Sequence, residues 1–313
     1  MKTIRLSHPS IFERVILFKN LFMKSEFTDV TLPQKLGNYL FHSRIEKDNP
    51  YKSFGTGIYV KSGKKYFVKI WKGRQKDFKY YSLMNEYFIS KALNRRSLRR
   101  KNLFIYVPNV VEYFHTDEMF AVVFKYIEGK TLSKYPYSTQ GKFLSKVLLN
   151  LGDLSKKILK EDRKNIKKTT AIDYILTFHA FIVLAMFVHK KDRIFISTTY
   201  FTHILKAFPL FRRKLVLTHG DLNTSNIIVS NNKLYVLDGE YMRLTVAEFD
   251  SSYLSFTKNY ASFEKYINKK VKIERNDFLK AYIAIQYAIV KNPITGEYDF
   301  LNLLKKGERY ASK

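Results

Sequence analysis

Hydrophobic and polar residues alternate in three short runs between Tyr39 and Trp71: YLFHSRI, GIYVKSG and KKYFVKIW. A period of two residues is typical of strands with one buried face, and Ser62-Gly63 between the last two runs is a hairpin-turn signal. Residues 77–93 then place apolar side chains at helical spacing. The pattern predicts three antiparallel strands followed by a helix.

Two more strands are predicted at 110–114 and 119–127, after which Glu128-Gly129-Lys130 interrupts the apolar pattern. Beyond this break the chain becomes mainly helical. The predicted helices cover 143–160, 172–188 and 200–207, the predicted strands cover 215–218, 227–229 and 234–237, and helices resume near 246. We therefore expect an α+β protein in two parts, residues 1–128 with an antiparallel sheet and residues 129–313 mainly helical, without internal repeats.

Composition adds a strong positive charge to this picture. The 313 residues contain 56 Lys and Arg against 27 Asp and Glu, a net charge of +29. Such a surface attracts nucleotides, nucleic acid or acidic lipid head groups. Codon bias in an A/T-rich genome is an equally good explanation of the lysines. The absence of cysteine excludes disulfides, thiolate metal sites and cysteine nucleophiles.

One stretch, Tyr174–Val188, is almost wholly apolar. Its 15 residues are short for a membrane span, so we expect a buried helix. The first 20 residues carry scattered charges and lack the apolar core of a signal peptide. We expect a cytoplasmic protein, with contact to the inner face of the membrane through its basic clusters as a further option.

The most informative segment is 217–250, LTHGDLNTSNIIVSNNKLYVLDGEYMRLTVAEFD. Asn226 follows Asp221 by five residues, and Asp238 ends an apolar strand. Phosphoryl transfer needs a carboxylate that orients and deprotonates the attacking hydroxyl, and oxygen ligands that hold Mg²⁺ on the phosphates. A loop followed by a hairpin turning at Asn231-Asn232 would bring these three side chains together.

This segment resembles the catalytic loop and metal motif of the aminoglycoside phosphotransferase and choline kinase superfamily. The resemblance implies a two-lobed protein-kinase-like fold, with Asp221 as catalytic base and with Asn226 and Asp238 as magnesium ligands. It also implies a structural role for His219 and a bracing role for Asp250. The expected cofactors are ATP and Mg²⁺.

The resemblance extends upstream in the family's order. Lys69 lies where the family places the lysine that binds the α and β phosphates, and Glu86 lies where a helix glutamate pairs with that lysine. Gly55 and Gly57 precede a strand where a nucleotide-covering loop belongs, since glycines let backbone N–H groups approach phosphates. The first part of the chain is therefore expected to be the nucleotide-binding lobe.

The stretch around Lys125, Tyr126 and Ile127 resembles the hinge that bonds adenine through its main chain. Lys125 departs from the family, where many relatives carry an acid at this position. The resemblance covers about residues 39–260.

The acceptor is expected to be a hydroxyl of a small molecule or a glycolipid sugar. Only 11 residues separate Asp238 from Asp250, and Asn223 stands where protein kinases carry a lysine, so little room remains for docking a peptide. An anionic or membrane-bound acceptor suits the charge better than a polycation. The basic clusters that would hold acidic lipid are Arg95-Arg96, Arg99-Arg100-Lys101, Lys164 with Lys167 and Lys168, and Arg212-Arg213-Lys214.

Three other classes stay open: an atypical protein kinase, a non-catalytic kinase-like binding protein, and a nucleic-acid binder. Lys69, Asp221, Asn226 and Asp238 are all present, which is against a binding protein that has lost activity. The chain shows no zinc pattern or basic recognition helix. Magnesium-dependent ATP turnover would separate the enzyme from the last two classes.

Overall fold

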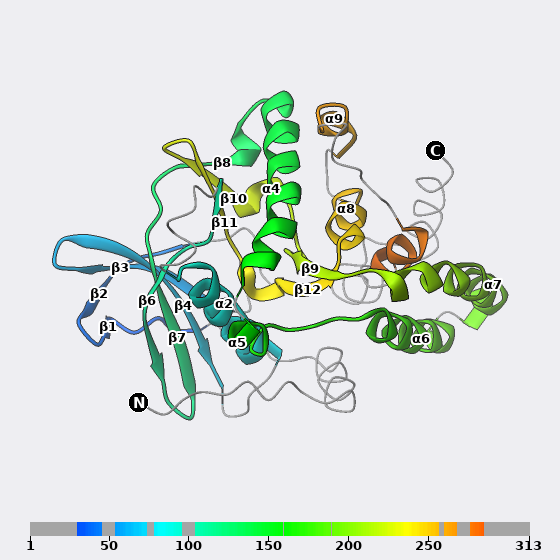
Figure 1. Ribbon diagram of the computed structural model, residues 1–313. Coiled ribbons are helices and arrows are strands. Elements are labelled where there is room, and N and C mark those ends of the chain that lie inside the picture. Colours follow the sequence, from blue (N-terminus) through cyan, green and yellow to red (C-terminus); the bar gives the residue numbers. More distant parts are fainter. Residues whose placement is uncertain are drawn as a thin grey trace. The chain divides into compact units, whose positions relative to one another are not determined.

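The computed structural model describes residues 30–45, 54–73, 78–95, 104–158, 160–188, 190–256, 260–267 and 276–284 (Figure 1). The protein is α+β, as the sequence pattern predicted. It divides into two compact units. Unit 1 contains Met1–Leu132, Lys157–Lys167 and Ser225–Met242, and unit 2 contains Ser133–Lys156, Lys168–Thr224 and Arg243–Lys313.

Unit 1 is built on a six-stranded antiparallel sheet. Its strands are β1 (Lys35–Leu36), β2 (Tyr39–Arg44), β3 (Gly55–Lys61), β4 (Lys64–Lys72), β6 (Val110–His115) and β7 (Met119–Lys125), in the order β1-β2-β3-β4-β7-β6. Ser62 and Gly63 both have positive φ angles, 49° and 72°, and join β3 to β4 in the predicted hairpin. Positive φ at both central residues matches the twist of the flanking strands.

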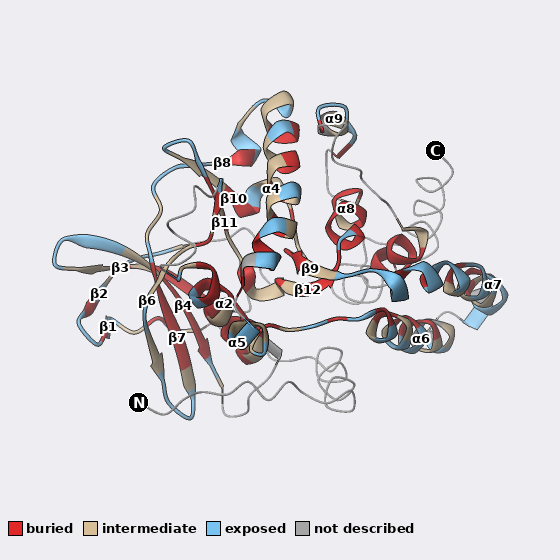
Figure 2. Cartoon of the chain, in the orientation of Figure 1, coloured by how far each residue is buried: buried red, intermediate tan, exposed pale blue. Residues whose placement is uncertain are grey.

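Helix α2 (Phe78–Leu93) covers one face of this sheet. Alternation along β4 decides which side chains meet the helix. Trp71 and the half-buried Phe67 pack on the α2 side with Phe120, whereas Val68 and Ile70 lie in the core on the opposite face. Figure 2 shows the centres of β4 and β7 as buried. Lys69 shares its face with Phe67 and Trp71 and therefore projects towards α2.

A second, four-stranded sheet in unit 1 has the order β5-β11-β10-β8. Its strands are β5 (Ile105–Tyr106), β8 (Lys130–Thr131), β10 (Ile227–Ser230) and β11 (Lys233–Val236). Asn231 and Asn232, with φ angles of 46° and 60°, turn the β10–β11 hairpin where the sequence predicted it. Asparagine tolerates this left-handed backbone better than most residues do. The short helix α5 (Lys160–Arg163) also belongs to this unit.

Unit 2 is mainly helical. Its elements are α4 (Tyr137–Lys157, whose last residue falls in unit 1), α6 (Ala171–Val188), α7 (Arg193–Ile204), the 3₁₀ helix η3 (Leu205–Arg212), α8 (Glu248–Leu254), α9 (Tyr260–Glu264) and the pair β9 (Leu215–Thr218) and β12 (Arg243–Val246). Helix α4 begins earlier than predicted because the carbonyl of Pro136 accepts the N–H groups of Thr139 and Gln140.

Helix α6 confirms the expected helix in the apolar stretch but buries only one side of it. Tyr174, Phe178 and Ile182 are buried, whereas Ile172 and Leu176 are exposed. Tyr174 stacks on Phe249 of α8 with ring centroids 5.5 Å apart. Within the described ranges, no helix combines the length and apolar character needed to cross a bilayer.

Candidate active site

The centre of unit 1 is a buried ammonium group between two carboxylates. Lys69 Nζ donates to Glu86 Oε2 at 2.8 Å and to Asp238 Oδ1 at 2.6 Å. The Lys69 side chain is 2% exposed and that of Asp238 is 18% exposed, so the pair opens to solvent at the aspartate. The ring of Phe54 lies 5.7 Å from Lys69 Nζ. Lys69 and Glu86 therefore pair as the sequence predicted, and the contact of Lys69 with Asp238 is a further finding of the structure.

The charge on Lys69 is maintained by its neighbours. Burial by itself would lower the pKa of Lys69, but the carboxylates of Asp238, Glu86 and Glu240 together raise it well above the ordinary lysine value. A buried charge is tolerated when it is paired and hydrogen-bonded. Lys69 is therefore a fixed positive charge with its two carboxylate partners held in place.

Asp238 turns the chain at the end of β11. Its φ of 54° lies in the left-handed region, which aspartate enters more readily than most residues do. The short helix η5 (Gly239–Tyr241) follows directly. This turn lets a strand-end carboxylate face Lys69.

Asn85, a residue that sequence reasoning missed, holds the segment after Asp238 against α2. Its side-chain amide lies within hydrogen-bond distance of the carbonyls of Gly239 (3.3 Å), Glu240 (3.1 Å) and Met242 (2.7 Å). Its Oδ1 accepts the N–H of Lys167 at 3.4 Å. Because Asn85 directly precedes Glu86, one turn of α2 carries Glu86 and also holds the segment that follows Asp238. Both carboxylate partners of Lys69 are therefore fixed by the same turn. The available signal was a polar Asn directly before Glu86 in the predicted helix.

The β10–β11 hairpin brings Asn226 back to the end of β11. Asn226 ends η4 (Thr224–Asn226), is buried, and its backbone carbonyl accepts the N–H of Leu237 at 2.8 Å. The predicted juxtaposition with the Asp238 position is therefore present in the backbone. Both side chains offer oxygen, and Mg²⁺ in phosphoryl-transfer sites takes one or two protein carboxylates plus phosphates and water. The described residues contain no cluster of three His, Cys, Asp or Glu side chains, so a metal here would depend on such mixed ligands.

The loop that carries Asp221 belongs to unit 2 and follows β9. Buried Asp250 of α8 accepts the N–H of His219 at 2.7 Å and of Gly220 at 2.9 Å. Burial raises the pKa of the Asp250 carboxyl, while His219 and these two N–H groups oppose that rise. His219 Nδ1 in turn accepts the N–H of Asp221 at 3.2 Å. Gly220 has a φ of 82°, a conformation that glycine adopts without a steric cost. The two hydrogen bonds that Asp250 accepts brace the loop, as expected.

Tyr253 is a second residue that the sequence did not reveal. It lies on α8, one turn after Asp250, and its hydroxyl donates to Asp221 Oδ1. Its ring stacks on Phe249 with centroids 6.4 Å apart. A tyrosine in a helix carries no sequence signal for such a contact, because only the fold shows which carboxylate it meets.

The structure corrects the predicted position of Gly55 and Gly57. Gly55 and Gly57 do not precede the strand but lie within β3, paired with Ile70 and Val68 of β4. A Cβ at Gly55 would lie 2.8 Å from Leu32 Cδ2, and one at Gly57 would lie 3.0 Å from Leu32 Cδ1. Close packing explains both glycines. The preceding residues 46–53 lie outside the described part of the chain.

The predicted adenine hinge falls between two strands. Lys125 ends β7, and Tyr126 and Ile127 lead from it towards β8. The backbone N–H of Lys125 already donates to the carbonyl of Asn109 at 2.9 Å. The backbone N–H of Lys125 is therefore not offered to a nucleotide. The side chain of Lys125 is exposed at the end of β7.

The basic clusters have different surroundings. Arg95 binds Glu161 and Asp162, each at 2.6 Å, so its charge is largely compensated within unit 1. Residues 96–103, which include the Arg99-Arg100-Lys101 cluster and Arg96, lie outside the described part of the chain. Arg212, Arg213 and Lys214 are exposed at the end of η3.

No protein-family model matches the chain, and no curated protein matches it by sequence. Solved structures match it in fold. A thermostable mutant of aminoglycoside phosphotransferase APH(4)-Ia has a TM-score of 0.60 at 11% identity, over 92% of this chain and 96% of that chain. The gentamicin complex of APH(2")-IIa has a TM-score of 0.57 at 16% identity, over 97% and 96% of the two chains. Spectinomycin phosphotransferase with ADP and spectinomycin has a TM-score of 0.54 at 14% identity, over 87% of each chain. The chain therefore has the protein-kinase-like fold of the aminoglycoside phosphotransferases.

Proposed function

We propose that the protein is an ATP-dependent kinase that transfers the γ-phosphate to a hydroxyl of a small molecule or a glycolipid sugar. The observation that carries this proposal is the buried Lys69 between Glu86 and Asp238. A lysine paired with a helix glutamate, beside an aspartate that holds magnesium, is the arrangement that kinases use to position phosphates. The braced Asp221 loop adds a carboxylate suited to the acceptor.

Each residue then has a defined task. Lys69 neutralises the nucleotide phosphates, Glu86 orients Lys69, and the main chain of Tyr126 and Ile127 binds adenine. Asp238 and Asn226 would hold Mg²⁺, which supplies charge neutralisation at the β and γ phosphates. Asp221 accepts the proton of the acceptor hydroxyl. The oxygen of that hydroxyl bonds to the γ-phosphorus, and ADP leaves. Gly55 and Gly57 support the nucleotide site through packing rather than through a loop.

The acceptor class follows from the segment after Asp238 and from charge. The segment between Asp238 and α8 holds only η5 and β12, so it offers little room for a peptide platform. Two of the three fold relatives named above were solved with an antibiotic bound, gentamicin in one and spectinomycin in the other, which supports a small acceptor here. A net charge of +29 favours an anionic acceptor, such as a phosphorylated sugar or a glycolipid at the inner membrane surface. We place the enzyme in the cytoplasm.

The proposal is tested by ADP release from MgATP in the presence of amino alcohols, sugars and lipopolysaccharide-core acceptors. We expect turnover that depends on Mg²⁺ and on one acceptor class. A Lys69→Met variant should abolish turnover, whereas Lys65→Met, on the exposed start of β4, should retain it. Absence of turnover across the panel together with tight nucleotide binding would favour the kinase-like binding protein instead.

Replacing Tyr253 by phenylalanine should lower kcat about tenfold while leaving the KM for ATP unchanged. The variant keeps the ring that stacks on Phe249 but loses a hydrogen bond to a charged carboxylate, which contributes roughly 1.5–3 kcal/mol. Tyr253 would thus be a positioning residue for Asp221. Tyr200→Phe, which removes another hydroxyl in unit 2, is the control. A faster variant would show that the Tyr253 hydroxyl competes with the acceptor.

A further inference from the structure

Large apolar side chains are exposed along one face of α7 and η3. The members are Ile194 (86% exposed), Phe201 (67%), Leu205 (67%), Phe208 (62%) and Phe211 (50%). Successive members are seven, four, three and three residues apart, which returns them to the same side of the helical segment. The opposite side of the same segment buries Ile196, Ala207 and Leu210. An exposed apolar surface of this kind marks an interaction site. We call these five residues the α7–η3 surface.

Along the chain the α7–η3 surface is flanked mainly by positive charge, and the nearest acid is Asp192, two residues before Ile194. Residues 193–220 contain five Lys and Arg side chains and no Asp or Glu. Arg212 and Lys214 are exposed directly after Phe211. Phe208, Pro209, Phe211, Arg212 and Arg213 line an open hollow of about 730 Å³. Aromatic rings beside guanidinium groups suit an anionic group attached to an apolar one.

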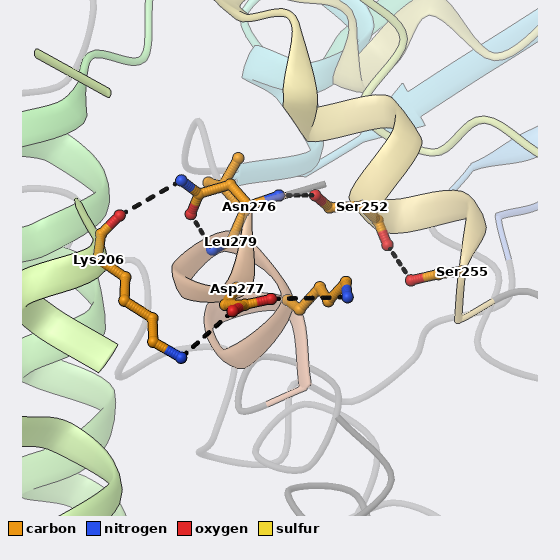
Figure 3. A network of polar contacts seen from close by, with 7 residues as sticks. Lys206, Ser252, Ser255, Asn276, Asp277 and Leu279 are labelled. Atoms are coloured by element: carbon orange, nitrogen blue, oxygen red, sulfur yellow. Dashed lines mark hydrogen bonds and ion pairs between the residues drawn. The ribbon is translucent and has the colours of Figure 1, made fainter. Parts of the chain in front are cut away.

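Other contacts hold η3 on its inner side. Lys206 Nζ binds Asp277 at 3.2 Å, and the carbonyl of Lys206 accepts the side-chain amide of Asn276 at 3.3 Å (Figure 3). Asn276 caps helix 277–284 by accepting the N–H of Leu279, and its own N–H bonds Ser252 of α8. Arg213 Nε binds Glu248 at 2.7 Å. Two of the five cations therefore anchor the segment, and the apolar face stays outward.

We propose that the α7–η3 surface docks on a bilayer that contains anionic lipid, with the phenylalanines at the interface and with Arg212 and Lys214 among the head groups. An exposed apolar helical face that ends in exposed basic residues has the composition that binds such a surface. A second copy of the chain would bring the same positive charges together, which opposes self-association. Docking would bring the enzyme to a membrane-bound acceptor, and this purpose rests on the proposed function.

The test is sedimentation of the full chain with vesicles of phosphatidylglycerol and phosphatidylcholine, compared with phosphatidylcholine alone. Binding should require the anionic lipid and weaken as salt rises, since charges are screened over about 8 Å at physiological ionic strength. Phe208→Ser with Phe211→Ser, and separately Arg212→Gln with Lys214→Gln, should each weaken binding about tenfold or more.

Matched controls use exposed residues of unit 1. Leu40→Ser with Phe104→Ser removes two exposed apolar side chains, and Lys64→Gln with Lys65→Gln removes two exposed charges. Both controls should stay within about twofold of the parent. Equal losses in controls and α7–η3 variants, or equal binding to neutral vesicles, would overturn the proposal. A dimer in sedimentation velocity that Phe208→Ser abolishes would assign the surface to a second copy and overturn it as well.

A second measurement does not depend on vesicle partitioning. Trp71 is the only tryptophan and is 2% exposed, so Phe208→Trp adds one reporter at the surface. Brominated lipid in anionic vesicles should quench Phe208→Trp and not the parent. Lack of quenching overturns the proposal. These readouts need no turnover: failed docking with intact MgATP turnover on a soluble acceptor rejects the docking alone, and docking without turnover rejects the kinase alone.

Discussion

Replacing Asp221 by asparagine is expected to lower phosphoryl transfer about 100-fold or more while leaving ATP affinity unchanged. Asparagine keeps the shape of the side chain and still accepts the Tyr253 hydrogen bond, but it does not take a proton from the acceptor hydroxyl. Adenine and phosphates are assigned to residues of unit 1, so the change leaves their binding groups intact. ADP release under saturating acceptor, together with calorimetry of nucleotide binding, measures the two quantities separately.

The control for this variant is Asp153→Asn, an exposed aspartate of α4 that pairs only weakly with Lys156. It changes the net charge by the same amount and should leave kcat within about twofold. Turnover of Asp221→Asn equal to that of the parent would remove Asp221 from the mechanism. Loss of ATP affinity with the same variant would instead place the aspartate at the nucleotide.

The contact of Lys69 with Asp238 was not predicted, but the order of motifs in the sequence was enough to predict that Lys69 pairs with Glu86. Each is informative only in combination, because a single strand lysine or helix glutamate is usually a surface charge. Their meeting could be predicted because local patterns place each on a strand or helix, and alternation along β4 fixes the side on which Lys69 projects. The two hairpin turns were predictable because Gly63, Asn231 and Asn232 enter positive φ more readily than most residues do.

Other features depend on contacts that no local pattern encodes. Gly55 and Gly57 looked like a phosphate loop, but their side of β3 is covered by Val30 and Leu32, which are more than 20 residues away in the chain. Asn85 and Tyr253 have their roles only because η5 and the Asp221 loop lie against their helices. Strand β12 is four residues long and exists through its pairing with β9. Tertiary context decides all of these cases.

Replacing Asp238 by alanine should weaken nucleotide affinity in Mg²⁺ about tenfold or more, because the hard cation loses a carboxylate ligand. Without Mg²⁺ the expected change is in the other direction. Asp238 binds Lys69 at 2.6 Å, and its removal leaves Lys69 paired with Glu86 and with more charge available to the phosphates. Affinity for ATP in EDTA should therefore be higher than that of the parent.

This opposite response separates a metal ligand from a residue that only supports the fold, since unfolding would weaken binding in both conditions. Glu240→Gln is the matched control: Glu240 also raises the pKa of Lys69, so the variant removes a nearby negative charge without removing the proposed ligand. Its affinity should depend on Mg²⁺ as that of the parent does. Equal Mg²⁺ dependence in Asp238→Ala and the parent would show that Asp238 does not bind the metal, and its contact with Lys69 would then be an ion pair alone.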